Sequence, residues 1–145
     1  MTFSAILFDC DGVLVDSEVI YVEVERAHLS RIGLTYSLSD YQSRFNGLTS
    51  TDFFAAVAED YEALGKGPFP DDFASALDEA TLIRLDQDLA AVSGIEDLLN
   101  TYRGPKAVAS SSRLQRLHRK LRKTGLHHHF APHIYSGEQV ENGKP

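Results

Sequence analysis

A short apolar run followed at once by closely spaced acidic residues stands near the start of the chain: FSAILFDCDGVLVDSE, residues 3–18. The run from Phe3 to Phe8 is almost continuously apolar, which is typical of a strand buried on both faces in a parallel sheet. It stops abruptly at Asp9, and Gly12 allows a sharp turn that brings main-chain N–H groups close to a ligand. The stretch therefore predicts a buried strand that ends in a ligand-binding turn.

Helix signals dominate the next part of the chain, residues 16–89. Side chains that can cap a helix precede apolar stripes at helical spacing, and glycines follow several of these stripes. We expect four helices there, which begin near Ser17, Ser39 (in a capping box with Gln42), Thr49 or Ser50, and Asp71.

After residue 89 the pattern changes to short apolar strands that alternate with helices. We expect a helix from Ile95 to Tyr102, a strand at Lys106–Ala109, a helix carrying Leu114, Leu117 and Leu121, and a strand at His133–Ser136. Strands that alternate with helices imply βα units and a parallel sheet. The predicted fold class is therefore α/β, with an all-helical insert directly after the first strand.

Composition narrows the possible classes of protein. The single cysteine excludes an internal disulfide and a cysteine-based zinc site. The net charge of −7 argues against a nucleic-acid partner. No apolar run approaches the roughly 18 residues that a membrane span needs, and acidic residues interrupt the apolar start where a signal peptide would lie. We expect a cytoplasmic monomer without a nucleic-acid or membrane partner.

Asp9 and Asp11 are the main candidates for chemistry. They follow a predicted buried strand, and ligands bind beyond the carboxyl ends of strands in a parallel sheet. Two crowded carboxylates repel each other unless a cation joins them, and oxygen ligands favour Mg²⁺. One carboxylate could instead act as a nucleophile. Alternatively, both residues only shape the turn, since aspartate is common in turns.

The run from Phe8 to Glu18 resembles the first signature of the haloacid dehalogenase (HAD) superfamily, most closely the β-phosphoglucomutase and phosphatase branch with a helical cap. The resemblance implies that Asp9 is the nucleophile and a Mg²⁺ ligand. It implies that Asp11 is the general acid and base, and that its main chain also binds the metal. It further implies a Rossmann-like core, incomplete in this chain, at 1–15 and 90–145, with a cap domain at 16–89.

Two later segments resemble the second and third signatures of the superfamily. Ser110 ends an apolar strand, as the phosphate-binding serine or threonine of the family does, and Lys144 stands in a Lys-Pro pair. The resemblance implies that Gly12, Ser110, Ser111 and Lys144 bind the substrate phosphate. Taken alone, the serines could equally cap a helix, and Lys144 could be a solvated loop residue.

Four further positions resemble substrate-contacting positions of related phosphomutases: Gly47, Thr49, Ser112 and Arg113. Ser50 stands where β-phosphoglucomutases carry an arginine, which favours hydrolysis over transfer to a sugar. The acidic pair of the fourth signature is absent, so we expect a chain that is truncated after the third signature. Arg113 to Lys123 are rich in basic residues, which we interpret as the outer face of an amphipathic helix.

The combined pattern predicts a Mg²⁺-dependent phosphatase that acts on a small phosphorylated metabolite, similar to a sugar phosphate, through an aspartyl-phosphate. Three alternatives remain open at this point. The protein could be a phosphomutase of the β-phosphoglucomutase type, a phospho-acceptor signalling module such as a receiver domain, or a non-catalytic fragment. A helical insert after the first strand does not suit a receiver domain.

Overall fold

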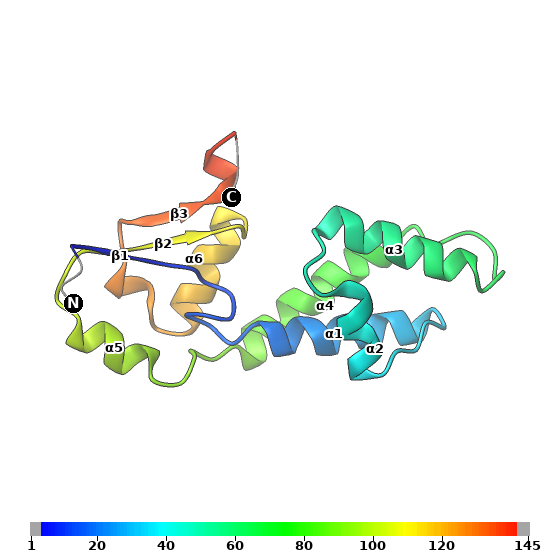
Figure 1. Ribbon diagram of the computed structural model, residues 1–145, viewed down its shortest axis with the longest axis horizontal. Coiled ribbons are helices and arrows are strands. Elements are labelled where there is room, and N and C mark those ends of the chain that lie inside the picture. Colours follow the sequence, from blue (N-terminus) through cyan, green and yellow to red (C-terminus); the bar gives the residue numbers. More distant parts are fainter. Residues whose placement is uncertain (1–3, 142–145) are drawn as a thin grey trace. The chain divides into compact units, whose positions relative to one another are not determined.

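The computed structural model describes residues 4–141 and divides the chain into two compact units (Figure 1). The first unit comprises residues up to 20 and from 84 onward, and the second comprises residues 21–83. The chain passes between the units inside two helices, α1 (Glu18–Arg31) and α4 (Phe73–Asp88). None of the described helices is long and apolar enough to cross a membrane.

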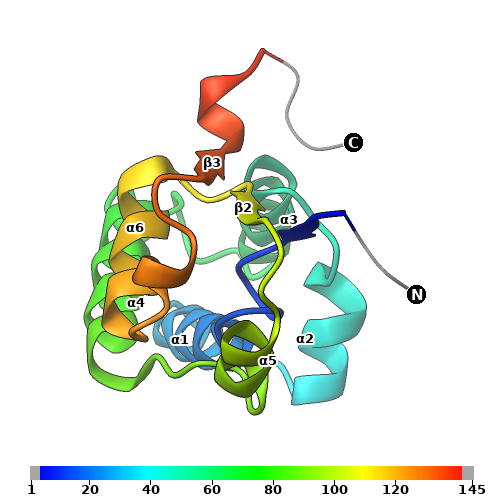
Figure 2. The ribbon, with the colours of Figure 1, turned by 90° about the vertical axis from the view of Figure 1, so that its left-hand side faces the viewer.

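The first unit is built on a parallel sheet. Within the described residues this sheet has three strands in the order β1 (Ile6–Phe8), β2 (Lys106–Ser110) and β3 (Ile134–Ser136). The helices α5 (Ile95–Thr101) and α6 (Leu114–Lys123) connect them and lie on the same side of the sheet in both views (Figures 1 and 2). The arrangement confirms the expected α/β class, with an incomplete Rossmann-like core and an all-helical insert.

The strand register separates the two faces of the sheet. Phe8 pairs with Val108, and Val108 pairs with Ile134, so these three buried side chains share one face. Two short 3₁₀ turns, η1 (His127–His129) and η2 (Gly137–Gln139), flank β3.

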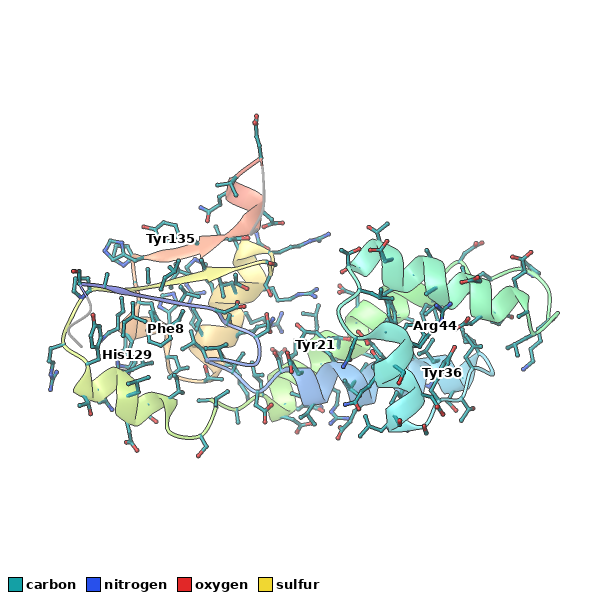
Figure 3. The ribbon with its side chains drawn as sticks, viewed as in Figure 1. Phe8, Tyr21, Tyr36, Arg44, His129 and Tyr135 are labelled. Carbon is teal, nitrogen blue, oxygen red and sulfur yellow. The ribbon has the colours of Figure 1, made fainter. Side chains whose placement is uncertain are left out.

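The opposite face of the sheet is open among the described residues. Leu7 is 67% exposed and Tyr135 is 48% exposed. Figure 3 shows Tyr135 on the side of the sheet away from Phe8. The prediction that the first strand is buried on both faces is therefore wrong for this chain, because α5 and α6 both cover the other face. The strand is also shorter than expected, since β1 begins only at Ile6.

All four expected helices are present in and around the second unit: α1, α2 (Leu38–Phe45), α3 (Ser50–Glu62) and α4. Thr49 caps α3 by accepting a hydrogen bond from the N–H of Asp52. The expected capping box at Ser39 is wrong, because the hydroxyl of Ser37 caps α2. α4 begins at Phe73, slightly later than the expected start at Asp71.

Aromatic side chains form much of the core of the second unit. The ring of Phe45 lies 5.1 Å from those of Tyr41 and Phe53, measured between centroids. At the edge of this core, Arg44 donates hydrogen bonds to the carboxylate of Asp60, which also accepts one from the hydroxyl of Tyr36 (Figure 3). This network ties α2 to α3.

Glu25 on α1 gives the second unit a pH-dependent stability. It accepts a hydrogen bond from the hydroxyl of Tyr41, and burial raises its pKa from 4.5 to about 7. The folded state therefore holds this proton more tightly than the unfolded state does. Its contribution to the free energy of unfolding is fully present below about pH 4.5 and is lost as the pH rises through about 7.

Replacing Glu25 by glutamine should remove this dependence. Between pH 5 and pH 8 the free energy of unfolding of the wild type should fall by about 2 kcal/mol more than that of Glu25→Gln. Urea denaturation at both pH values measures the difference. Glu62→Gln, which changes an exposed carboxyl on α3, is the control and should behave as the wild type does. An equal fall in the wild type and in Glu25→Gln would refute the prediction.

Candidate active site

The carboxyl ends of the three parallel strands meet at one edge of the sheet. Asp9 directly follows β1, Ser110 ends β2 and Ser136 ends β3. Parallel sheets bind ligands beyond this edge. The topology thus brings the first and second sequence signatures to the same place.

A tight turn follows β1 and presents Asp9 at the surface. The carbonyl of Cys10 accepts hydrogen bonds from the N–H groups of three later residues, Val13, Leu14 and Val15. Gly12 has φ +73°, a conformation that residues with a side chain rarely adopt, and a Cβ there would lie 2.9 Å from a side-chain oxygen of Glu18. The side chain of Asp9 is exposed, and its Oδ1 accepts the N–H of Cys10 at 2.7 Å.

The N–H of Gly12 is already engaged within this turn. It donates to the carbonyl of Val15 at 2.9 Å. The sequence analysis predicts that Gly12 binds the substrate phosphate. In this structure its N–H group stabilises the turn after β1.

Asp11 is held by three donors from three parts of the fold. The hydroxyl of Ser17, just before α1, donates to Oδ1 at 2.5 Å. The ammonium of Lys120, on α6, also donates to Oδ1 at 2.5 Å. The hydroxyl of Ser112, in the loop between β2 and α6, donates to Oδ2 at 2.9 Å. Both oxygens of this carboxylate are therefore occupied.

Two opposing effects act on the pKa of Asp11. Burial raises it, while the positive charge of Lys120 and hydrogen bonds from Lys120, Ser17 and Ser112 lower it, and the net direction is down. The carboxylate is therefore ionised at neutral pH in this arrangement. A general acid must carry a proton, so Asp11 must take one up before it can act in that role.

The serines that follow β2 form a compact cluster. Ser110 is buried, and its hydroxyl accepts the N–H of Ser112 at 3.1 Å. The carbonyl of Ser112 accepts the hydroxyl of Ser136 at 2.7 Å. Ser111 is exposed beside them. No acceptor for the hydroxyl hydrogen of Ser110 is found among residues 4–141, so this hydrogen can be donated to a ligand.

The other expected site residues lie apart from the hydrogen-bond network of Asp11 and the serines, or outside the residues that the structure describes. The side chain of Arg113 is 82% exposed and lies 3.9 Å from Glu138. Gly47 and Thr49 belong to the second unit, where the hydroxyl of Thr49 is used in capping α3. Lys144 lies outside the described residues.

Lys120 is the site residue that the sequence analysis missed. The interpretation of the basic residues on α6 as a solvated face is wrong for this one, because Lys120 is only 2% exposed. A signal was present in the spacing: Lys120 lies three residues after Leu117 and next to Leu121, so it shares their helix face. The interpretation holds for Arg119, whose exposed side chain pairs with Asp86.

The oxygen atoms at the edge fit a hydrated Mg²⁺ ion in part. Asp9 offers a carboxylate, and no hydrogen bond within residues 4–141 ends on the main-chain carbonyl of Asp11. Mg²⁺ often binds through one or two protein oxygens and keeps several waters. The Asp11 side chain is occupied by Lys120, so only its main chain fits as a ligand. Among residues 4–141 no group of three or more His, Cys, Asp or Glu side chains could hold a metal.

Comparisons with known proteins identify the family. Residues 6–145 match the family described as haloacid dehalogenase-like hydrolase. The chain belongs to this family. A structure of a haloacid dehalogenase-like protein of unknown function from Agrobacterium tumefaciens superposes with a TM-score of 0.82 at 34% identity, covering 95% of this chain and 60% of that one. A HAD family hydrolase from Deinococcus radiodurans, with bound phosphate and sodium, gives 0.79 at 33% identity, covering 99% and 62%.

Curated relatives of this HAD chain are phosphatases. The 6-phosphogluconate phosphatase of Escherichia coli is 29% identical over 143 residues, which is 97% of this chain and 62% of the relative. The phosphorylated carbohydrates phosphatase of Thermotoga maritima is 27% identical, over 97% of this chain and 64% of the relative. The chain thus spans less than two thirds of the length of either phosphatase.

Proposed function

We propose that this HAD protein is a Mg²⁺-dependent phosphatase that hydrolyses a small phosphorylated metabolite similar to a sugar phosphate. The observation that carries the proposal is the exposed carboxylate of Asp9 at the edge of the sheet. It lies two residues before Asp11, whose carboxylate accepts hydrogen bonds from Ser112 and Lys120. The names of both curated relatives support this substrate class.

In the first half of the reaction, a carboxylate oxygen of Asp9 attacks phosphorus. The bond between phosphorus and the leaving oxygen breaks, and Asp11 donates a proton to that oxygen to release an alcohol. In the second half, Asp11 takes a proton from a water molecule as this water attacks the aspartyl-phosphate. Inorganic phosphate leaves, and Asp9 returns to its carboxylate form.

Mg²⁺, when bound, would neutralise negative charge on the phosphoryl group. Asp9 and the main-chain carbonyl of Asp11 are the described groups that would hold it. Buried Ser110 donates its hydroxyl hydrogen to a phosphate oxygen, and Ser111 lies beside it for the same role. Lys144 follows the family pattern as a further phosphate contact.

A bound phosphate also changes the state of Asp11. Its negative charge opposes the ionised form of this carboxyl and so favours uptake of the proton that the first half of the reaction consumes. Residues 16–89 follow the family pattern of a cap domain. Gly47 and Thr49 follow the family pattern of cap residues that recognise the rest of the substrate.

Phosphate release by the complete gene product tests this proposal. We expect turnover of 6-phosphogluconate or a related sugar phosphate with Mg²⁺, and a loss of at least about a hundredfold with EDTA that added Mg²⁺ restores. Full activity in EDTA would contradict the metal requirement. No phosphate release from any of a panel of sugar phosphates would contradict the substrate class.

Product analysis separates hydrolysis from phosphoryl transfer within the sugar. Thr49 and Ser50 follow the Gly47 turn without an arginine that could hold a second phosphate, which favours hydrolysis. With β-glucose 1-phosphate we expect glucose and inorganic phosphate. Glucose 6-phosphate as the main product would show a mutase instead.

A further inference from the structure

We infer that Lys120 is a positioning residue for Asp11, which holds the carboxylate against α6 in one orientation. The inference rests on the proposed role of Asp11 as general acid and base. The ammonium of Lys120 contacts Asp11 and Ser112, and we infer that its effect on the reaction runs through Asp11.

The geometry forms a closed triangle of hydrogen bonds. The ammonium of Lys120 lies 2.5 Å from Oδ1 of Asp11 and 3.0 Å from the hydroxyl oxygen of Ser112. That hydroxyl in turn donates to Oδ2 of Asp11 at 2.9 Å. Because Lys120 and Ser112 bind different oxygens of the carboxylate, they fix its rotation as well as its position.

A purely structural role explains this lysine poorly. Burying an ammonium group carries a large desolvation penalty, and an apolar side chain of similar length would pack beside Leu117 and Leu121 without it. The other basic residues near the end of α6, such as Lys123, are exposed. The buried ammonium group of Lys120 on α6 instead donates a hydrogen bond to Asp11, the proposed general acid and base.

Loss of the contact between Lys120 and Asp11 should affect departure of the leaving group more than it affects attack by Asp9. Attack by Asp9 does not need Asp11, whereas departure of an alkoxide needs a well-placed proton donor. Phosphorylation of Asp9 by a substrate whose leaving group departs without a proton should therefore be insensitive to Lys120. Hydrolysis of the aspartyl-phosphate, which is common to all substrates, should slow equally with each of them. A general weakening of the fold would lower both kinds of turnover equally.

The test compares two substrates in the complete gene product carrying Lys120→Met. With p-nitrophenyl phosphate, whose leaving group is already stable as an anion, we expect the rate of p-nitrophenolate release in a single turnover to fall by less than about threefold. With an alkyl phosphate such as a sugar phosphate, the rate of alcohol release in a single turnover should fall at least about tenfold further. Lys123→Met, on the exposed side of the same helix, should change neither value.

Three further measurements make the outcome decisive. In the same single-turnover assay, Asp11→Asn should show the same preference for p-nitrophenyl phosphate, only larger. A crystal structure of Lys120→Met should show Asp11 turned away from α6. If Lys120→Met does not fold, as judged by thermal unfolding, Lys120→Gln replaces it, because glutamine removes the charge and can still bond to Ser112.

Equal losses with both substrates, or no loss, would overturn the role of Lys120. In that case Asp9→Asn shows whether only the inference about Lys120 fails or the proposed function fails as well. If Asp9→Asn is inactive, only the inference about Lys120 fails. If Asp9→Asn remains active, the proposed function fails as well.

Discussion

Asn in place of Asp9 should abolish phosphate release from every substrate that the protein hydrolyses. An amide has no carboxylate oxygen with which to form the aspartyl-phosphate, so kcat should fall at least about a thousandfold. The side chain of Asp9 is exposed, and its Oδ1 accepts a hydrogen bond from the N–H of the next residue. Asparagine can keep that bond through its oxygen, so the stability of the fold should change little.

Steady-state assays of phosphate release measure this effect, and thermal unfolding checks the fold. The matched control is Asp97→Asn, which removes an exposed carboxylate from α5 in the same unit. This control should retain wild-type turnover. Turnover of Asp9→Asn within tenfold of the wild type would rule out Asp9 as the nucleophile.

The largest expected loss of stability follows from Phe130→Ala. Phe130 is 1% exposed, and its ring meets that of Phe8 edge to face with 5.6 Å between centroids. Removing a fully buried phenyl ring leaves a cavity, so the free energy of unfolding should fall by about 3–5 kcal/mol. Because Phe8 directly precedes Asp9, the same change should loosen the start of the turn that carries Asp9.

Chemical denaturation of the two matched aromatic variants tests this packing. Tyr135→Ala removes a half-exposed ring from β3, and we expect it to cost about 1 kcal/mol or less. Similar losses for Phe130→Ala and Tyr135→Ala would contradict the assignment of the core to the side of the sheet covered by α5 and α6.

The sequence predicts at which edge of the sheet the candidate site lies, because the strands are parallel. Once the runs before Asp9 and Ser110 are recognised as neighbouring parallel strands, their carboxyl ends must lie together. The helices of the second unit are similarly predictable, since apolar stripes and capping residues are local signals. Thr49, for example, caps α3 as expected.

Other features depend on information that a local pattern does not contain. Ser37 and Ser39 are both suitable caps, and in the structure Ser37 caps α2. An apolar run also does not reveal which face of a strand a helix covers, so the exposure of Leu7 was missed. The burial of Lys120 was missed because a dense run of charges usually marks a solvated helix face, whereas one member here pairs with a carboxylate on another segment.

Trapping the covalent intermediate tests the central claim most directly. Asp11→Asn should slow hydrolysis of the aspartyl-phosphate, while p-nitrophenyl phosphate should still phosphorylate Asp9 because its leaving group needs no proton. Acid quenching followed by mass spectrometry of the digested protein should then locate one phosphoryl group on Asp9. A phosphoryl group on Ser110 or another residue, or turnover without any covalent phosphoprotein, would contradict the account.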